Sequence, residues 1–203
     1  MEHVEGSEDR ILTIPNVITA VRLSCVPVFL WLLFARDDRL AAAWLLAALG
    51  ATDWVDGYIA RRWNQISKLG KVLDPVADRI LLLVGVVAIV IDGSVPIVVA
   101  VLSLAREALV SIATLVLAAL GARRIDVTWF GKKGTFFVMT AFPLFLLGNV
   151  DDGPWSTFGY WAGWAFAVPG LVLGYLALAQ YVPLGLEALR QGRADRAAAE
   201  AAA

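Results

Sequence analysis

The sequence is short of residues on which many soluble enzymes and secreted domains rely. It has one cysteine, Cys25, so no disulfide can form within the chain. Its only histidine, His3, lies in an acidic segment, so we expect no histidine-based metal site or catalytic triad. The formal net charge is −1, which offers no broad basic surface for nucleic acid. Acidic residues stand where a signal peptide carries basic ones, so we expect no cleavable signal peptide.

Long apolar runs dominate what is present. Of the 203 residues, 60% are hydrophobic, which is too many for an ordinary soluble protein of this size. The runs show no strand-like alternation, and most are long enough to cross about 30 Å of hydrocarbon as helices. We therefore predict an all-α polytopic membrane protein, a bundle of six transmembrane helices. The predicted spans are residues 15–35, 40–62, 72–91, 95–120, 134–149 and 158–184.

The distribution of the 17 lysines and arginines predicts the orientation. One side receives Arg10, the basic residues in and around the 62–72 and 121–133 loops, and those of the tail. The other side receives Arg36 and Arg39, which are offset by Asp37 and Asp38, and then Asp92. The positive-inside rule then places both termini in the cytoplasm, in agreement with an even number of spans. We expect one domain over residues 1–203, with a cytoplasmic segment at about 1–13 and a frayed helical tail at about 186–203. The predicted location is the cell membrane.

Four aspartates flank the loop between the second and third spans. Asp53 and Asp56 are three residues apart, and Asp74 and Asp78 four, so each pair shares a helix face. If the loop turns the chain back, both pairs meet near the cytoplasmic surface. One unpaired aspartate at the centre of a membrane helix costs about 2.5–3.5 kcal/mol, and four would also repel one another. Two divalent cations would balance the charge, and carboxylates without His or Cys favour Mg²⁺ or Mn²⁺.

Small and basic residues accompany the acidic pairs. Gly57 and Ala60 would let a ligand or a neighbouring helix approach the backbone, and Arg61 can offer a planar fork to a phosphate. A purely structural interpretation stays open for single aspartates. Asp74 precedes a proline, as a helix N-cap often does, and Asp78 could pair with the arginine beside it.

These residues form a pattern that resembles a known family. Asp53-x-x-Asp56-Gly57-x-x-Ala60-Arg61, followed at fixed spacing by Gly70, Asp74 and Asp78, resembles the complete signature of the CDP-alcohol phosphatidyltransferases. Ile14-Pro15-Asn16-Val17-Ile18-Thr19 with Arg22 resembles the start of the family's first span. Asp74-Pro75-Val76-Ala77-Asp78 and Ala105-Arg106-Glu107 resemble the phosphatidylglycerophosphate synthase and cardiolipin synthase branches. The resemblance covers about residues 10–150.

The resemblance implies a six-span, dimeric enzyme with its active site at the cytoplasmic face. Such an enzyme transfers a phosphatidyl group from CDP-diacylglycerol to an alcohol and releases CMP. It implies that Asp53, Asp56 and Asp74 hold two metal ions, and that Asp78 is the general base and can also touch a metal. The residues implied to contact CDP-diacylglycerol are Asn16, Thr19, Gly57, Arg61 and Ser67.

Basic residues further along the chain are candidates for binding the acceptor's phosphate. They are Arg106, Arg123, Arg124, Lys132 and Lys133. Arg106 lies well inside the predicted fourth span, so it should face a cavity or a partner. Glu107 is adjacent and should point elsewhere on the helix, which leaves a bundle aspartate as the alternative partner. Lys132 and Lys133 could also be plain orientation charges.

The choice of acceptor is the open question. The prediction that we favour from the sequence is glycerol 3-phosphate, a small phosphorylated alcohol. Phosphatidylglycerophosphate synthases, however, often carry a Lys-x-Lys-Thr-like stretch before the fifth span, and this chain has Gly134 at the second basic position. A cardiolipin synthase that uses phosphatidylglycerol is the close alternative, and an inositol phosphate acceptor is less favoured. A transporter that uses the aspartates as a cation relay is a distant alternative. Transport sites lie near the bilayer midplane, whereas we expect these aspartates at one membrane surface.

Overall fold

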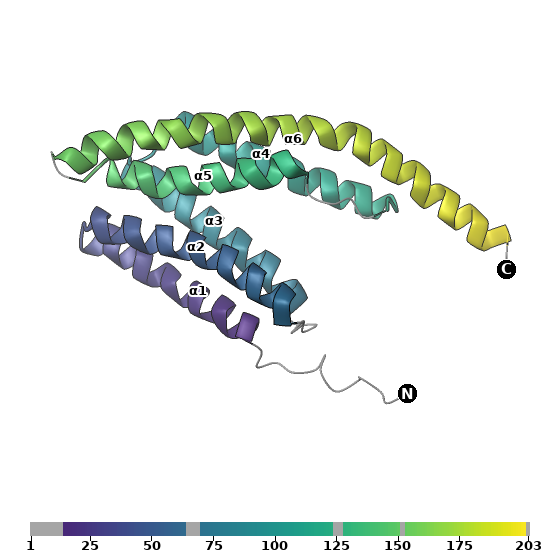
Figure 1. The fold of residues 1–203 in the computed structure, drawn as a ribbon, viewed down its shortest axis with the longest axis horizontal. Helices are drawn as coiled ribbons and strands as arrows, with labels where there is room; N and C mark the ends of the chain where they lie inside the picture. Colours follow the sequence, from purple (N-terminus) through teal and green to yellow (C-terminus); the bar gives the residue numbers. More distant parts are fainter. Residues whose placement is uncertain (1–13, 64–69, 124–127, 151–152, 202–203) are drawn as a thin grey trace. The chain divides into compact units, whose positions relative to one another are not determined.

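The computed structural model describes the backbone of residues 14–63, 70–123, 128–150 and 153–201, and the side chains of residues 19–52, 80–123, 128–150 and 153–196. In this part of the chain every regular element is a helix (Figure 1). The elements are α1 (Ile14–Leu30) with the π-helical turn η1 (Trp31–Ala35), α2 (Arg39–Trp63), α3 (Gly70–Asp92), α4 (Ile97–Ala119), α5 (Trp129–Leu147) and α6 (Pro154–Ala201). The predicted all-α fold and the order of its six helices are confirmed.

Two of the predicted helices differ in extent from the structure. α5 begins at Trp129 instead of residue 134, because Thr128 caps it: the Thr128 Oγ1 accepts a hydrogen bond from the Gly131 amide at 3.2 Å. α6 does not end at 184. It runs on to Ala201, so the tail that we expect to be a frayed helix is continuous with α6 through that residue.

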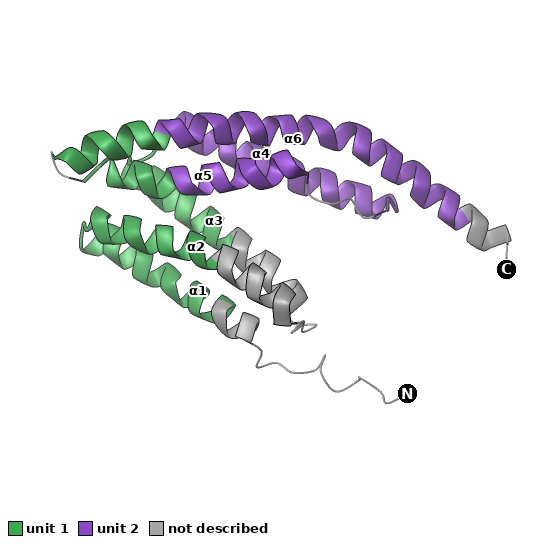
Figure 2. Ribbon diagram, viewed as in Figure 1, with its two compact units in different colours: residues 1–96, 142–163 green, residues 97–141, 164–203 purple. Residues whose placement is uncertain are grey.

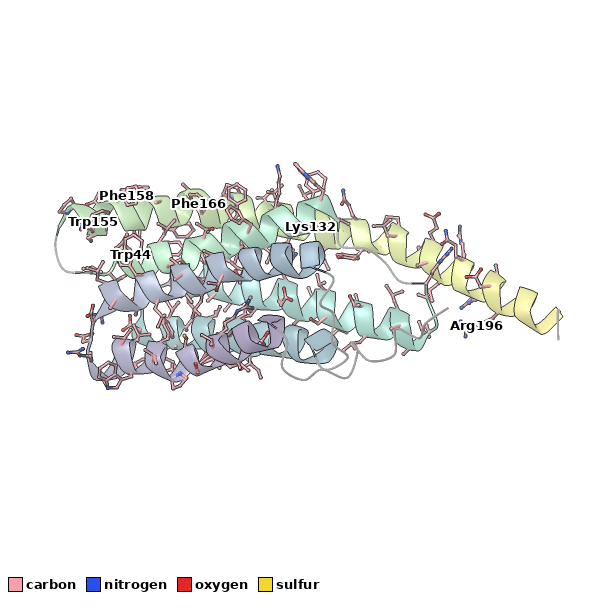
Figure 3. All side chains as sticks on the ribbon, turned by 60° about the horizontal axis from the view of Figure 1, so that its bottom comes forward. Trp44, Lys132, Trp155, Phe158, Phe166 and Arg196 are labelled. Atoms are coloured by element: carbon pink, nitrogen blue, oxygen red, sulfur yellow. The ribbon has the colours of Figure 1, made fainter. Side chains whose placement is uncertain are left out.

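Three helices are long and apolar enough to cross a membrane, judged by length and composition among the residues whose side chains are described. They are Ile97–Ala119, Trp129–Leu147 and Pro154–Arg196. Three shorter apolar helices, Thr19–Ala35, Arg39–Thr52 and Ile80–Asp92, accompany them. Large apolar side chains stay exposed along α4, among them Ile112 (58%) and Leu115 (65%). A helix surface of this kind suits contact with lipid. At the start of α6, Trp155 and Phe158 (Figure 3), together with Trp161, are exposed aromatic residues of the type that anchors spans at a bilayer surface.

The described chain divides into two compact units (Figure 2). The first consists of Met1–Pro96 with Phe142–Gly163, and the second of Ile97–Ala141 with Trp164–Ala203. In the first unit, α1 packs against both α2 and α3. Its interior is built from large side chains such as Phe29, Leu33, Ile89 and Phe145, each at most 3% exposed.

A polar network ties three connections of the first unit together. Arg39 at the start of α2 makes two hydrogen bonds of 3.1 Å to the carboxylate of Asp92 at the end of α3. The Ser94 hydroxyl also donates to Asp92, whose side chain is only 6% exposed. Asn149, after α5, donates to the Ser94 carbonyl oxygen at 2.9 Å. The network therefore fixes the ends of α3 and α5 against the start of α2.

The second unit is held by small residues on α6. Buried glycines and alanines recur every three or four residues, at Ala167, Gly170, Gly174 and Ala177 and again at Gly185, Ala188 and Gly192. Such a row lets helices approach backbone to backbone, as is common in membranes. A Cβ built on Gly134 of α5 would lie 2.7 Å from the Gly174 nitrogen, closer than real side chains come. α5 and α6 therefore touch at their backbones here.

Candidate functional site

Most of the predicted metal and nucleotide residues lie outside the side chains that the structure describes. Asp53, Asp56, Gly57 and Arg61 belong to the helical stretch of α2, Asp74 and Asp78 to that of α3, and Asn16 to the first turn of α1. Ser67 and Arg124 lie outside the described residues altogether. The roles of these residues thus stay predictions. The described parts of α1, α2 and α3 show how the helices that carry most of these residues pack together.

α1 presents a polar face to the interior of the first unit. Thr19 is 3% and Arg22 6% exposed, whereas Ala20 and Val21 between them are exposed. Residues three apart lie on one side of a helix, so this face is turned towards the helices against which α1 packs, α2 and α3. Thr19, predicted to close over CDP-diacylglycerol, is therefore an interior residue.

α2 and α3 run antiparallel in a defined register. Arg39 and Asp92 form the ion pair at one end of the two helices. Seven residues further along α2 is Leu46, and seven residues back along α3 is Gly85. These two positions also meet, since a Cβ on Gly85 would lie 3.8 Å from the Leu46 Cδ1. Each helix advances by seven residues between these two contacts, so α2 and α3 keep the same register over two helical turns.

The second unit contains a largely buried arginine, Arg106, and we call Arg106 with its neighbours Thr135 and Gly174 the basic site. The Arg106 side chain is 13% exposed; its Nη1 donates to Glu107 Oε2 at 3.0 Å and to Thr135 Oγ1 at 3.2 Å. The expectation that Glu107 would point elsewhere is thus wrong: the long arginine side chain folds back along α4 and reaches its neighbour. The Arg106 Nε is buried and has no hydrogen-bond partner among the described residues.

A glycine makes room for this arginine on α6. A Cβ on Gly174 would lie 3.3 Å from the Arg106 Nε and 3.7 Å from its Cδ. The guanidinium thus lies close to bare backbone of α6 and also donates to Thr135 of α5. A buried donor that lacks a partner costs free energy, and an anion at this point would recover it.

The other predicted acceptor residues lie at or near the start of α5. Lys132 is exposed (Figure 3), and the Lys133 Nζ sits 3.7 Å from the centroid of the Trp129 ring. This cation–π contact engages Lys133 locally. Arg123 is exposed, and its amide donates to the Ala188 carbonyl oxygen of α6 at 3.0 Å. Among the described residues, no hydrogen bond or ion pair joins Lys132, Lys133 or Arg123 to Arg106, so the structure does not bring these four into one cluster.

Sequence reasoning missed two residues of the basic site, Thr135 and Gly174. The signal for Gly174 was available: Gly170 and Gly174 are spaced as small residues are at close helix crossings. Thr135 carried no such signal, because its role depends on where α4 meets α5.

No group of three or more His, Cys, Asp or Glu side chains that could hold a metal occurs among the residues with described side chains. The four aspartates of the signature are not among them. They stand on α2 and α3, which run antiparallel, and they offer only oxygen ligands. Ligands of this kind fit hard divalent cations.

The described residues form helices only, and three of these are long and apolar enough to cross a membrane, which fits a polytopic membrane protein. The profile of the CDP-alcohol phosphatidyltransferase family matches residues 12–170, and the chain belongs to that family. It is 40% identical over 196 residues to the cardiolipin synthase (CMP-forming) of Streptomyces coelicolor, covering 94% of this chain and 89% of that protein. It is 34% identical over 136 residues to the CDP-diacylglycerol–glycerol-3-phosphate 3-phosphatidyltransferase of Escherichia coli K12, covering 63% and 73%.

Proposed function

We propose that this phosphatidyltransferase is a CMP-forming cardiolipin synthase, which transfers the phosphatidyl group of CDP-diacylglycerol to phosphatidylglycerol. The observation that carries the proposal is the extent of similarity. The match to a cardiolipin synthase spans 94% of the chain, and the match to a glycerol-3-phosphate enzyme spans 63%. Glycerol 3-phosphate, the acceptor favoured from the sequence, is therefore less well supported than the alternative, phosphatidylglycerol.

The packing around Gly134 supports the same acceptor. In the resemblance to phosphatidylglycerophosphate synthases, a second lysine stands at this position. Here a side chain would collide with the backbone of Gly174, so α5 offers one cation fewer. Glycerol 3-phosphate carries a phosphomonoester close to a dianion, whereas phosphatidylglycerol carries a monoanionic phosphodiester. Arg106, already paired with Glu107, suits the lower charge.

The register of α2 and α3 supports the proposed metal site. Continuing the spacing of the Arg39–Asp92 and Leu46–Gly85 contacts by another seven residues reaches Asp53 on α2 and Asp78 on α3. Seven residues fall only about 20° short of two full helical turns, so the next positions lie on nearly the same faces. Asp56 and Asp74 come one turn nearer the loop. We infer that the four carboxylates gather at two neighbouring levels of one helix pair.

In the proposed mechanism, Asp53, Asp56 and Asp74 would hold two Mg²⁺ or Mn²⁺ ions, with Asp78 in reach of them. The ions would supply charge stabilisation for the pyrophosphate as CMP departs. Arg61, with Gly57, Ser67, Asn16 and Thr19, would bind and orient the CDP group. The resulting site belongs at the cytoplasmic surface of a six-span bundle in the cell membrane, with both termini cytoplasmic. The homodimer and the single domain stay predictions.

The reaction then needs one proton acceptor from the chain. Asp78 would accept the proton of the acceptor hydroxyl, because a neutral hydroxyl is a weak nucleophile. The hydroxyl oxygen forms a bond to the phosphorus that carries diacylglycerol, and the bond from that phosphorus to the bridging oxygen breaks. CMP leaves with the electron pair. Arg106 would bind the acceptor's phosphate.

The test is a product analysis with purified protein in lipid vesicles. Labelled CDP-diacylglycerol is offered with phosphatidylglycerol or with glycerol 3-phosphate, one at a time. We expect labelled cardiolipin and CMP with phosphatidylglycerol. Formation of phosphatidylglycerophosphate, with no cardiolipin, would show that the acceptor is wrong although the reaction class is right.

A further inference from the structure

The second unit contains an interaction that neither the family signature nor the proposed reaction uses. α4 ends in a tight turn at Gly121, whose φ is +73°. The Gly121 amide donates to the Ala118 carbonyl oxygen and the Ala122 amide to that of Leu117, both at 2.9 Å. This pairing is the usual way of ending a helix at a left-handed glycine. The carbonyl oxygens of Leu120 and Gly121 then need donors from elsewhere.

Arg196, near the end of α6, supplies those donors. Its Nη2 donates to the Leu120 oxygen at 2.9 Å and to the Gly121 oxygen at 3.3 Å, and its Nε donates to the Gly192 oxygen at 3.2 Å. One guanidinium thus joins the α4 terminus to α6. A positive charge beside the last carbonyls of a helix is also favoured by the helix dipole.

Backbone contacts bring the same parts of the chain together. A Cβ on Gly192 would overlap the carbonyl oxygen of Gly121, so only glycine fits there. One turn earlier, the Ala188 oxygen accepts the Arg123 amide at 3.0 Å. Another turn back, Gly185 lies close to Leu117 of α4. We call residues 185–196 of α6 the C-terminal arm.

The arm is therefore a packing element and not a loose tail. Its glycines and alanine continue the spacing of small residues by which α6 packs elsewhere in the second unit. A tail without a partner would gain nothing from glycine in a helix, because glycine costs about 1 kcal/mol relative to alanine. The arm also lies beyond residues 12–170, the part matched by the family profile.

We propose that the C-terminal arm positions the end of α4, with Arg123 just after it, for acceptor binding, and that Arg196 is the positioning residue. The arm holds the backbone of Arg123, one of the basic residues that the sequence predicts for acceptor binding. Arg196 acts on the backbone of this segment and does not itself touch substrate. The inference rests on the proposed function, because it takes phosphatidylglycerol as the acceptor, and it uses the prediction from the sequence that Arg123 binds the acceptor's phosphate.

The experiment compares full-length variants in vesicles containing phosphatidylglycerol. Arg196→Ala removes the hydrogen bonds of Arg196 to the Leu120 and Gly121 oxygens, which we call the clamp. Arg196→Lys keeps the charge but cannot reach both oxygens in the same geometry. Gly192→Ala forces the arm away from the end of α4. Arg193→Ala is the matched control, because Arg193 is an exposed arginine of the same helix. Two readouts are taken: the kinetic constants for donor and acceptor, and hydrogen exchange of peptides covering residues 117–123.

We expect Arg196→Ala to raise the KM for phosphatidylglycerol about threefold to tenfold, as the loss of charge-assisted hydrogen bonds predicts. The kcat and the KM for CDP-diacylglycerol should change by less than about twofold, as for an exposed charge that makes no contact. Exchange in 117–123 should accelerate. Gly192→Ala should change the acceptor KM and the exchange in the same direction as Arg196→Ala. Arg196→Lys should give values between those of Arg196→Ala and the wild type, and Arg193→Ala should match the wild type in both readouts.

The contrary outcomes separate this inference from the proposed function. Unchanged exchange in Arg196→Ala would refute the clamp. Faster exchange with an unchanged acceptor KM, or with both KM values and kcat altered together, would refute its positioning role. Arg106→Ala and Arg123→Ala are measured in parallel. If Arg106→Ala leaves the acceptor KM normal, the proposed acceptor site is wrong and the arm's role falls with it; if Arg106→Ala raises the acceptor KM and either Arg123→Ala or Arg196→Ala does not, only the arm's role is wrong.

Discussion

The contact between α5 and α6 at Gly134 allows a quantitative prediction. A Cβ at this position would lie 2.7 Å from the Gly174 nitrogen, 3.0 Å from the Gly174 Cα and 3.1 Å from the Gly170 oxygen. Normal contacts between carbon atoms are about 3.5–4.0 Å, so Gly134→Ala must force two backbones apart. Overpacking of this kind costs about 1–3 kcal/mol, and alanine's better helix propensity returns at most about 1 kcal/mol.

With the full return subtracted, the net loss of up to about 2 kcal/mol should lower the melting temperature by up to roughly 8 °C for a chain of this length. Thermal unfolding is followed by intrinsic tryptophan fluorescence in one detergent at one scan rate, since unfolding of such proteins is often irreversible. Gly50→Ala on α2 is the control, because a Cβ there meets no atom within 4 Å. It should melt at or above the wild-type temperature. If Gly134→Ala melts no lower than Gly50→Ala, the backbone contact inferred here does not exist.

Three further substitutions test other parts of the structure. Arg106→Ala should raise the acceptor's KM at least about tenfold, because a buried charge-assisted contact is lost, and leave the donor's KM nearly unchanged; equal effects in steady-state kinetics would indicate a scaffolding role. Asp78→Asn should abolish turnover while CDP-diacylglycerol binding, measured with labelled lipid, persists; near-normal turnover would remove Asp78 as the base. Asp92→Asn should lower the melting temperature, because Arg39 loses its bidentate partner, with kcat of the folded enzyme unaffected; an unchanged melting temperature would mean that the network is not stabilising.

The helices were largely predictable because their signal is local. Apolar runs bounded by turns, such as the run that ends at Asp92 before Gly93, gave four helices to within two or three residues of the structure. α5 was predicted to start too late, because Gly131, Lys132 and Lys133 have the composition of a loop, whereas Thr128 caps a helix that includes them. α6 was predicted to end too early for the same reason: its last turns are polar and charged.

The tertiary contacts were not predictable in the same way. Nothing local marks Arg196 as the donor to Leu120 and Gly121, which lie more than seventy residues earlier in the chain. Arg106 and Glu107 project from their helix in different directions, and only the length and bend of the arginine side chain let them pair. The acidic signature, by contrast, was evident from spacing and residue type, although its roles stay predictions. The identity of the acceptor could not be predicted from the sequence, because acceptor choice depends on how a few basic side chains are arranged in space around the acceptor's phosphate.

The central claim is that the aspartates of α2 and α3 come together to hold two divalent ions. Titration of purified protein with Mn²⁺, followed by electron paramagnetic resonance, tests it most directly, because it counts bound ions without needing turnover. We expect two ions per chain with mutual dipolar coupling, and loss of this coupled pair in Asp53→Asn and in Asp74→Asn. Unaltered Mn²⁺ binding in both variants, or no specific binding to the wild-type protein, would contradict the claim.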